Sequence, residues 1–237
     1  MKSNYYSKIP LRSKGVFREY FINSEVKIIL NFIKKYNKST VQLLDIGTGI
    51  GDNLSFFQDN LEGESVGLDY DYQSLYWGSQ GKCSLNLVCG SAQMLPFNDE
   101  TFDVITCIGL FEMKGSFERY IDEISRVLRC NGILIFTAWN SSAKYNFKFL
   151  NRKLLGSVSY SCTDIEFEIK RLDMKILEKT TTFYSPRLII LSMIRVSSIL
   201  GMGKLFVSLV NKINNVIRKT IYAEKNGMEW IIVVRKI

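Results

Sequence analysis

Apolar positions along the chain fall into short continuous runs that alternate with segments of helical spacing. The runs predict buried strands over residues 41–46, 65–69, 85–89, 133–136, 174–184 and 228–235. A further run that ends at Cys107 predicts the fourth strand in chain order. The intervening spacing predicts amphipathic helices over residues 17–36, 54–58, 117–128 and 163–172. A capping box, Thr163-x-x-Glu166, is expected to open the last helix. Strands that alternate with helices are typical of an α/β fold.

A glycine-rich turn follows the first predicted strand. The strand ends in Asp45-Ile46, and glycines then stand at every second position, Gly47, Gly49 and Gly51. Glycine suits this turn because the backbone takes positive φ there, and because a ligand can approach where a Cβ would collide. A strand, a glycine-rich turn and a helix in this order predict the first unit of a nucleotide-binding α/β fold.

The spacing of the glycines bears on which nucleotide binds. The dinucleotide pattern G-x-G-x-x-G requires its third glycine where Asp52 stands. A carboxylate there would repel a pyrophosphate, which a helix N-terminus otherwise favours. No Gly-Lys-Ser/Thr of a P-loop follows either. A ligand with a cation and hydroxyls but no phosphate tolerates Asp45 and Asp52 better, and S-adenosylmethionine (SAM) has this composition.

A second acid ends the next predicted strand. Asp69 lies about 20 residues beyond the glycines, where an acid can accept hydrogen bonds from both ribose hydroxyls of an adenosine. The alternative is that Asp69 caps the following helix, but Asp71 is better placed for that role. We therefore expect Asp69 to bind a ribose.

Two longer motifs resemble a known family. Residues 90–107, from Gly-Ser-Ala-Gln-Met-Leu-Pro-Phe onward, resemble the run G-D-A-x-x-L-P-F-x-D-x-x-F-D-x-V of class I SAM-dependent methyltransferases. Residues 126–136 resemble the R-V-L-K-P-G-G turn and fifth strand of that family. With the glycine loop and Asp69, four motifs stand in the family's order over residues 40–140. The resemblance is strongest to the broad group related to ubiquinone and menaquinone biosynthesis methyltransferases.

The resemblance implies a fold for the whole chain. The expectation is one domain over residues 1–237, with a Rossmann-like sheet of seven mostly parallel strands, helices on both faces and an antiparallel last strand. A length of 237 residues suits one such domain. The expected parts are a helical cap (1–40), a SAM-binding core (41–140) and a C-terminal half (141–237). A helical insertion over about 186–226 often forms a lid over the acceptor in this family.

The resemblance also assigns residues to the methionine and ribose ends of SAM. The family's glycine loop wraps the methionine end, which corresponds here to Asp45, Gly47, Gly49 and Gly51. The acid that ends the second strand holds the ribose in this family, and here that acid is Asp69.

The adenine end is less regular in this chain. The residue after the ribose-binding acid often packs on adenine in the family, and Tyr70 suits that role. The family's G-D-A acid usually contacts the adenine amino group, but this chain has Ser91, whose hydroxyl is a weaker acceptor than a carboxylate. The backbone amide of Ala92 is unaffected. Cys107 ends the fourth strand, where the family exposes a residue to the cofactor, although a core thiol is equally consistent.

Methyl transfer from SAM requires few catalytic groups, because SAM is already an activated electrophile and alignment supplies most of the rate. A base is needed only when the acceptor loses a proton. Glu112 follows the fourth strand and is our candidate for a base or a substrate-orienting acid; the alternative is a solvated loop glutamate or helix cap. The chain has no histidine, which argues against a zinc or iron site, so no metal is expected.

The sequence argues against several acceptors. It lacks the Asn/Asp-Pro-Pro-Tyr motif usual in enzymes that methylate amino groups of nucleic-acid bases, and it lacks the Pro-Cys typical of cytosine C5 chemistry. With the apolar helical insertion that often covers the acceptor in this family, we expect a small, lipophilic acceptor and S-adenosylhomocysteine as the second product. Two alternatives remain open: an RNA or protein methyltransferase that uses the basic flanks, and a module that binds SAM without catalysis.

Charge is distributed unevenly along the chain. The net charge of +8 divides into +7 for residues 1–40, −9 for 41–140 and +10 for 141–237. The predicted insertion has six basic residues and no acid from Arg187 to Ala223. Solvated helix faces that pack on the sheet are one interpretation. An apolar lid over a lipophilic acceptor, or a peripheral contact with an anionic membrane, is the other.

The compartment is predicted from the cysteines and the apolar runs. Five cysteines form no C-x-x-C pair, which is typical of free thiols in a reducing compartment. The N-terminus lacks the apolar core of a signal peptide, and the longest uncharged apolar run, 188–194, is far shorter than the ~20 residues of a spanning helix. We expect a cytoplasmic protein, with peripheral membrane contact and the oligomeric state left open.

Overall fold

The computed structural model describes residues 15–37, 40–81, 84–112, 117–143, 158–183, 187–220, 223 and 227–237. Its helices are α1 (Gly15–Phe21), the π-helical turn η2 (Ile22–Val26), α2 (Lys27–Tyr36), α3 (Asp52–Gln58), α4 (Tyr72–Gly81), α5 (Phe117–Val127), α7 (Cys162–Arg171), α8 (Arg187–Ile199) and α9 (Gly203–Arg218). Its strands are β1 (Val41–Ile46), β2 (Gly63–Asp69), β3 (Asn86–Cys89), β4 (Phe102–Cys107), β5 (Leu128–Asn140), β6 (Ser159–Tyr160), β7 (Met174–Thr182) and β8 (Glu229–Lys236).

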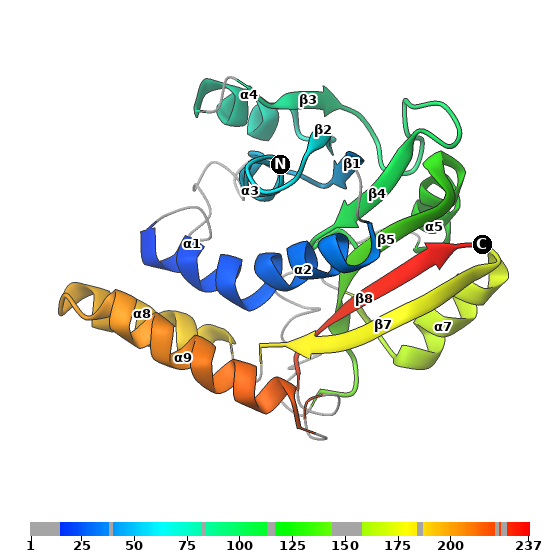
Figure 1. Ribbon diagram of the computed structural model, residues 1–237. Helices are drawn as coiled ribbons and strands as arrows, with labels where there is room; N and C mark the ends of the chain where they lie inside the picture. Colours follow the sequence, from blue (N-terminus) through cyan, green and yellow to red (C-terminus); the bar gives the residue numbers. More distant parts are fainter. Residues whose placement is uncertain are drawn as a thin grey trace.

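The strands form one sheet in the order β3-β2-β1-β4-β5-β8-β7, and the two-residue strand β6 pairs with β5. Strands β1 to β5 run parallel to one another, whereas β8 is antiparallel to both β5 and β7. Figure 1 shows helices on both faces of this sheet. The predicted seven-stranded, mostly parallel sheet with an antiparallel last strand is thus confirmed, and β6 is an addition to it.

The two faces of the sheet carry separate hydrophobic clusters. Successive side chains of a strand point to opposite faces, so Leu134 and Phe136 of β5 join one cluster while Ile133 and Ile135 join the other. Helices α5 and α7 cover the first cluster, and α2 and α3 cover the second. Full burial of one such side chain is worth about 1.5–3 kcal/mol, so both faces stabilise the fold.

The N-terminal cap is helical from residue 15 to residue 36, where the spacing of apolar residues predicted one or two helices. Ile29 and Ile33 of α2 are fully buried on the sheet. Tyr20 and Phe21 of α1 belong instead to a third cluster, which we call the lid cluster. It consists of Tyr20, Phe21, Trp139, Phe183, Ile190, Ile194, Val207, Val210 and Met228. The cap therefore packs on both the sheet and the helical insertion.

The insertion before the last strand is a hairpin of the two helices α8 and α9, in agreement with the predicted helical insertion. Figure 1 shows it beside α1 and α2, and both of its helices contact α1. The predicted limits of the insertion at 186 and 226, and the cap before residue 15, lie outside the described residues. The division into cap, core and C-terminal half stays a prediction. In the part of the chain that the structure describes, no helix is long and apolar enough to cross a membrane.

The helix α7 begins two residues earlier than the predicted capping box implies, so that prediction was wrong. Ser161 is the N-cap: its Oγ accepts a hydrogen bond from the Asp164 backbone N–H (3.1 Å), and the Ser161 N–H donates to the Asp164 carboxylate (3.0 Å). Both Ser161-x-x-Asp164 and Thr163-x-x-Glu166 fit the same pattern. Glu166 instead lies near the thiol of Cys162, which donates to it.

Candidate functional site

The candidate site lies at the carboxyl ends of three neighbouring strands. Strand β1 stands between β2 and β4. After β1 the chain first builds β2 and β3 on one side of it and then crosses over to build β4 and β5 on the other side. In open parallel sheets the crevice at such a switch point is where ligands bind. The loops after β1 and β4 meet there, because a Cβ added at Gly47 would lie 3.7 Å from the Leu110 side chain.

The glycine loop takes left-handed backbone conformations at all three predicted positions. The φ angles are +78° at Gly47, +58° at Gly49 and +74° at Gly51. A Cβ at Gly51 would lie 2.5 Å from the end of the Leu85 side chain, which would have to move, and the positive φ there also favours glycine. A Cβ at Gly49 would have no heavy atom within 4 Å. Gly49 therefore leaves open space beside the crevice, which a ligand can enter.

Asp69 is held in place by backbone groups of two different loops. Its Oδ2 accepts a hydrogen bond from the Gly49 N–H (2.8 Å), and its Oδ1 accepts one from the Asp71 N–H (2.9 Å). Burial raises the pKa of this carboxyl, while the two N–H donors oppose that rise. Each oxygen keeps a further lone pair for ligand hydroxyls. The predicted helix-capping role falls to Asp71, whose carboxylate accepts from the Gln73 N–H (3.1 Å).

Asp45 is a buried acid with half of its hydrogen-bonding capacity unused. The Thr106 hydroxyl donates to Oδ1 (2.7 Å), whereas Oδ2 has no hydrogen-bond partner among the described residues. Burial raises the pKa of the Asp45 carboxyl to about 6; the hydroxyls of Thr106 and Thr48 oppose the rise, and the negative charge of Asp69 adds to it. A buried carboxylate with a free oxygen is suited to a cationic ligand group.

The residues expected at the adenine end differ in exposure. Tyr70 is 66% exposed, so its ring is available to a planar ligand. Ser91 is exposed and its Oγ accepts a hydrogen bond from the Gln93 N–H (3.2 Å). Part of its acceptor capacity is therefore already used inside the turn. Ala92 is half-buried against the first hydrophobic cluster.

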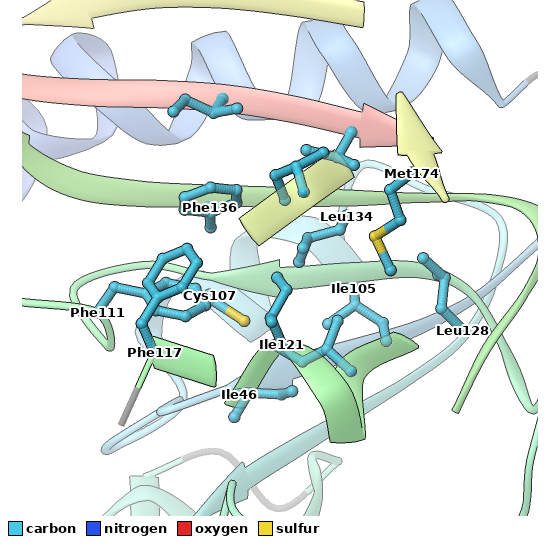
Figure 2. Close-up of a cluster of buried hydrophobic side chains, with 14 of the residues drawn as sticks. Ile46, Ile105, Cys107, Phe111, Phe117, Ile121, Leu128, Leu134, Phe136 and Met174 are labelled. Atoms are coloured by element: carbon cyan, nitrogen blue, oxygen red, sulfur yellow. The ribbon is translucent and has the colours of Figure 1, made fainter. Parts of the chain in front are cut away.

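Cys107 faces the interior of the protein rather than the crevice. Its side chain is fully buried, and Figure 2 shows it among Phe111, Phe117 and Ile121. Burial and the negative charge of Asp45 raise the pKa of the thiol well above its usual value. This placement fits the interpretation of Cys107 as a core thiol, and the predicted contact with the cofactor stays a prediction.

Glu112 lies in the turn after β4, at the edge of the described residues. Its backbone carbonyl accepts a hydrogen bond from the Val158 N–H (2.9 Å), which fixes the turn. Its Oε1 is buried and has no hydrogen-bond partner in the described part of the chain. Glu112 is therefore a partly buried side chain, and both its role as a base or orienting acid and the alternative of a loop glutamate or helix cap stay predictions.

Two partners of the site were missed by sequence reasoning. Thr106 holds Asp45 from the neighbouring strand, and Arg18 of the cap forms an ion pair with Asp52 in the first turn of α3 (3.0 Å). The argument that Asp52 repels a pyrophosphate assumed an unpaired carboxylate, so the Arg18 pair weakens it. Neither partner has a local signal, because the paired residues lie 61 and 34 positions apart.

The residues of this site fit SAM. The free Oδ2 of Asp45 suits an ammonium group, the open space at Gly49 suits close approach of a ligand, and Asp69 suits ribose hydroxyls. The binding roles of these residues stay predictions. Within the described residues, no group of three or more His, Cys, Asp or Glu side chains is placed to hold a metal ion.

Comparison with known proteins connects this site to a family. Residues 44–136, less than half of the chain, match the family described as a methyltransferase domain. An uncharacterised protein of Methanocaldococcus jannaschii is 26% identical over 171 residues, which cover 72% of this chain and 70% of that protein. Phthiotriol/phenolphthiotriol dimycocerosates methyltransferase 1 of Mycobacterium ulcerans is 32% identical over 99 residues, which cover 40% of this chain but only 36% of that protein.

A solved structure shares the fold. The SAM-dependent methyltransferase of Methanosarcina mazei superposes with a TM-score of 0.60 over 87% of this chain and 97% of that one, at 14% identity. At this identity the likeness shows the fold alone. The group related to ubiquinone biosynthesis stays a prediction. Residues 44–136 thus match a methyltransferase domain, and the chain has the fold of a SAM-dependent methyltransferase, which together support SAM-dependent methyl transfer as its activity.

Proposed function

We propose that this protein methylates a small, lipophilic acceptor. The observation that carries this proposal is the lid cluster, which closes the carboxyl-end edge of the sheet with aromatic and aliphatic side chains. Trp139 is the last residue but one of β5 and Phe183 follows β7, and both belong to a cluster with side chains of α1, α8 and α9. The rings of Tyr20, Phe21 and Phe183 lie 5.4–5.9 Å apart. An acceptor that contacts such side chains is favoured when it is apolar.

The name of one relative supports the same class of acceptor. The Mycobacterium ulcerans protein is named for phthiotriol and phenolphthiotriol dimycocerosates, and its match covers only 40% of this chain. The match supports a lipophilic acceptor. It does not identify the compound, because most of both proteins is left unaligned.

The chain's own residues have few tasks in this reaction. When bound, SAM supplies an activated methyl group. Asp45 would hold the ammonium group, Asp69 would orient the ribose, and the lid helices would exclude water. Methyl transfer breaks the S–CH₃ bond and forms the acceptor–CH₃ bond, and an acceptor that was protonated must lose its proton. We propose that Glu112 takes this proton or orients the acceptor, because one of its oxygens is buried without a hydrogen-bond partner among the described residues.

The proposal is tested by following the methyl group. The full-length protein is incubated with methyl-labelled SAM and, in separate reactions, with a lipid extract, total RNA or unlabelled protein. The proposal expects the label in an organic-solvent-soluble product of the lipid reaction. Asp69→Ala should abolish this labelling, and Glu112→Gln should slow it while SAM affinity stays unchanged.

Each other outcome of the labelling experiment contradicts the proposed acceptor. Label in RNA or in protein supports the alternative that the basic flanks bind a macromolecular acceptor. SAM binding by calorimetry without transfer to any of the three supports a binding module without catalysis.

A further inference from the structure

Helix α9 is apolar on the side that faces solvent. Its inner side packs on the protein through Val207 and Val210. At 3.6 residues per turn, a second set of apolar side chains falls within an arc of roughly 80° on the opposite side. This set consists of Met202 just before the helix, Leu205, Leu209, Ile213 and Val216, and each is 49–67% exposed. A surface helix normally presents polar residues there, so the outer stripe requires an explanation.

The stripe continues onto α8 and the turn between the helices. Met193, Val196, Ile199 and Leu200 are 47–77% exposed. Nine of the sixteen exposed large hydrophobic residues in the described chain therefore lie on this one hairpin. Single exposed apolar residues are ordinary, whereas a contiguous group marks an interaction surface. We call this group the hairpin face.

The charges around the hairpin face have one sign. From Arg187 to Ala223 the chain has six basic residues and no acid. Arg195, Lys204, Lys212 and Lys219 are exposed. On α9, Lys212 and Lys219 fall along one edge of the apolar stripe at helical spacing. The surface thus combines apolar side chains with a border of positive charge.

We propose that the hairpin face docks on an anionic lipid surface. Amphipathic helices with apolar residues on one side and Lys or Arg beside them lie in the interface of anionic membranes. A second copy of this chain fits less well, because a symmetric interface would place the same six positive charges on both sides. In Figure 1 the turn of the hairpin points away from the sheet, so the hairpin can reach a membrane without unfolding the site.

This surface gives a role to the hairpin beyond its packing against α1. An enzyme at the membrane surface meets lipophilic molecules where they are concentrated. The docking does not depend on methyl transfer, so it is measured without SAM, and its failure would leave the proposed acceptor class untouched.

The test is flotation of the full-length protein with vesicles. Phosphatidylcholine vesicles that contain phosphatidylglycerol are compared with phosphatidylcholine alone, at low and at high salt. We expect binding to the anionic vesicles at low salt, and less at high salt because screening weakens the attraction. The double variant Leu205→Ser/Leu209→Ser should lower the partition coefficient by roughly tenfold or more. Lys212→Gln/Lys219→Gln should lower it by a similar factor and reduce its salt dependence.

Matched controls lie on other helices. Phe167 of α7 is 69% exposed, so Phe167→Ser removes an equally exposed apolar side chain and should leave binding unchanged. Lys34→Gln/Lys170→Gln removes two exposed charges elsewhere and should have a much smaller effect than the hairpin pair. Circular dichroism and the melting temperature of each variant establish that it is folded.

Three results would overturn the proposal. The first is absence of binding to anionic vesicles at low salt. The second is binding that the Leu205 and Leu209 substitutions do not change. The third is a dimer in sedimentation experiments that these substitutions dissociate, without vesicle binding, since the hairpin face would then join two copies of the chain.

Discussion

The carboxylate of Asp69 accepts a hydrogen bond from the backbone N–H of Gly49 at 2.8 Å. This bond joins the acid that ends β2 to the middle glycine of the loop after β1. A ligand that touches one of these residues is therefore beside the other. The ribose and methionine parts of SAM are adjacent in the same way, which is why the pair is suited to that cofactor.

The ribose role of Asp69 predicts a specific loss of affinity. Asp69→Ala removes the charged acceptor, and hydrogen bonds to charged groups are worth about 1.5–3 kcal/mol. We expect the dissociation constant for SAM, measured by calorimetry, to rise roughly tenfold to hundredfold. Asp59→Ala, at an exposed carboxylate after α3, is the control and should bind as the wild type does. Unchanged affinity in Asp69→Ala would mean that the ribose lies elsewhere.

The open space at Gly49 predicts a variant that folds but binds poorly. In Gly49→Ala the new methyl group meets no protein atom within 4 Å, so the cost to folding is the left-handed backbone alone, roughly 1–2 kcal/mol. Gly201→Ala is a matched control, with φ +75° and no atom within 4 Å of its Cβ. Both variants should lose similar thermal stability, whereas only Gly49→Ala should bind SAM more weakly. Equal SAM affinity in the two variants would remove Gly49 from the binding site.

The buried acid Asp45 predicts opposite effects on stability and on binding. Its folded-state pKa of about 6 lies above the reference value of 3.8, so the folded protein holds a proton that the unfolded chain releases between these values. The wild type therefore loses stability as pH rises through this window, by up to roughly 3 kcal/mol. Asp45→Asn removes this loss.

The measurement for Asp45 is chemical unfolding at several pH values. Relative to the wild type, Asp45→Asn should become more stable as pH is raised from about 4 to about 7, while its SAM affinity falls. In the wild type, SAM affinity should decrease as pH falls through about 6, because protonated Asp45 no longer attracts an ammonium group. A stability difference that does not depend on pH would contradict the assigned pKa.

The burial of Cys107 predicts a role in stability alone. Cys107→Ser places a hydroxyl in the hydrophobic cluster, which should destabilise the protein by about 1–3 kcal/mol and leave SAM affinity unchanged. The native thiol should resist alkylation, because burial keeps it protonated. Cys89 is exposed and serves as the reactive control. Weaker SAM binding in Cys107→Ser without a loss of stability would indicate that Cys107 contacts the cofactor.

The sequence was most informative where the backbone itself carries the signal. Positive φ at Gly47, Gly49 and Gly51 follows from glycine at every second position after a strand, and the structure shows it at all three. The strand order then follows from the family's topology. The glycine turn depends on residues that are close together in the chain, so local reasoning finds it, whereas the strand order was taken from the resemblance.

Contacts between distant residues could not be predicted in the same way. The Arg18–Asp52 ion pair and the Thr106–Asp45 hydrogen bond depend on how the cap and the strands pack. The direction of Cys107 was accessible in principle, because residues two apart in a strand share a face and Ile105 lies in the same cluster. The alternation of strand residues therefore favoured a core thiol. The position of Cys107 at the end of the strand pointed instead to a contact with the cofactor.

Binding of SAM in preference to a dinucleotide tests the central claim most directly. Calorimetry of the wild-type protein should give a dissociation constant for SAM of micromolar order, which is about −8 kcal/mol. The same titration with NAD should give no heat of binding, because Asp52 has a side chain where the dinucleotide pattern requires glycine, and this holds even though Arg18 pairs with its charge. Absence of SAM binding, or equal binding of SAM and NAD, would contradict the account.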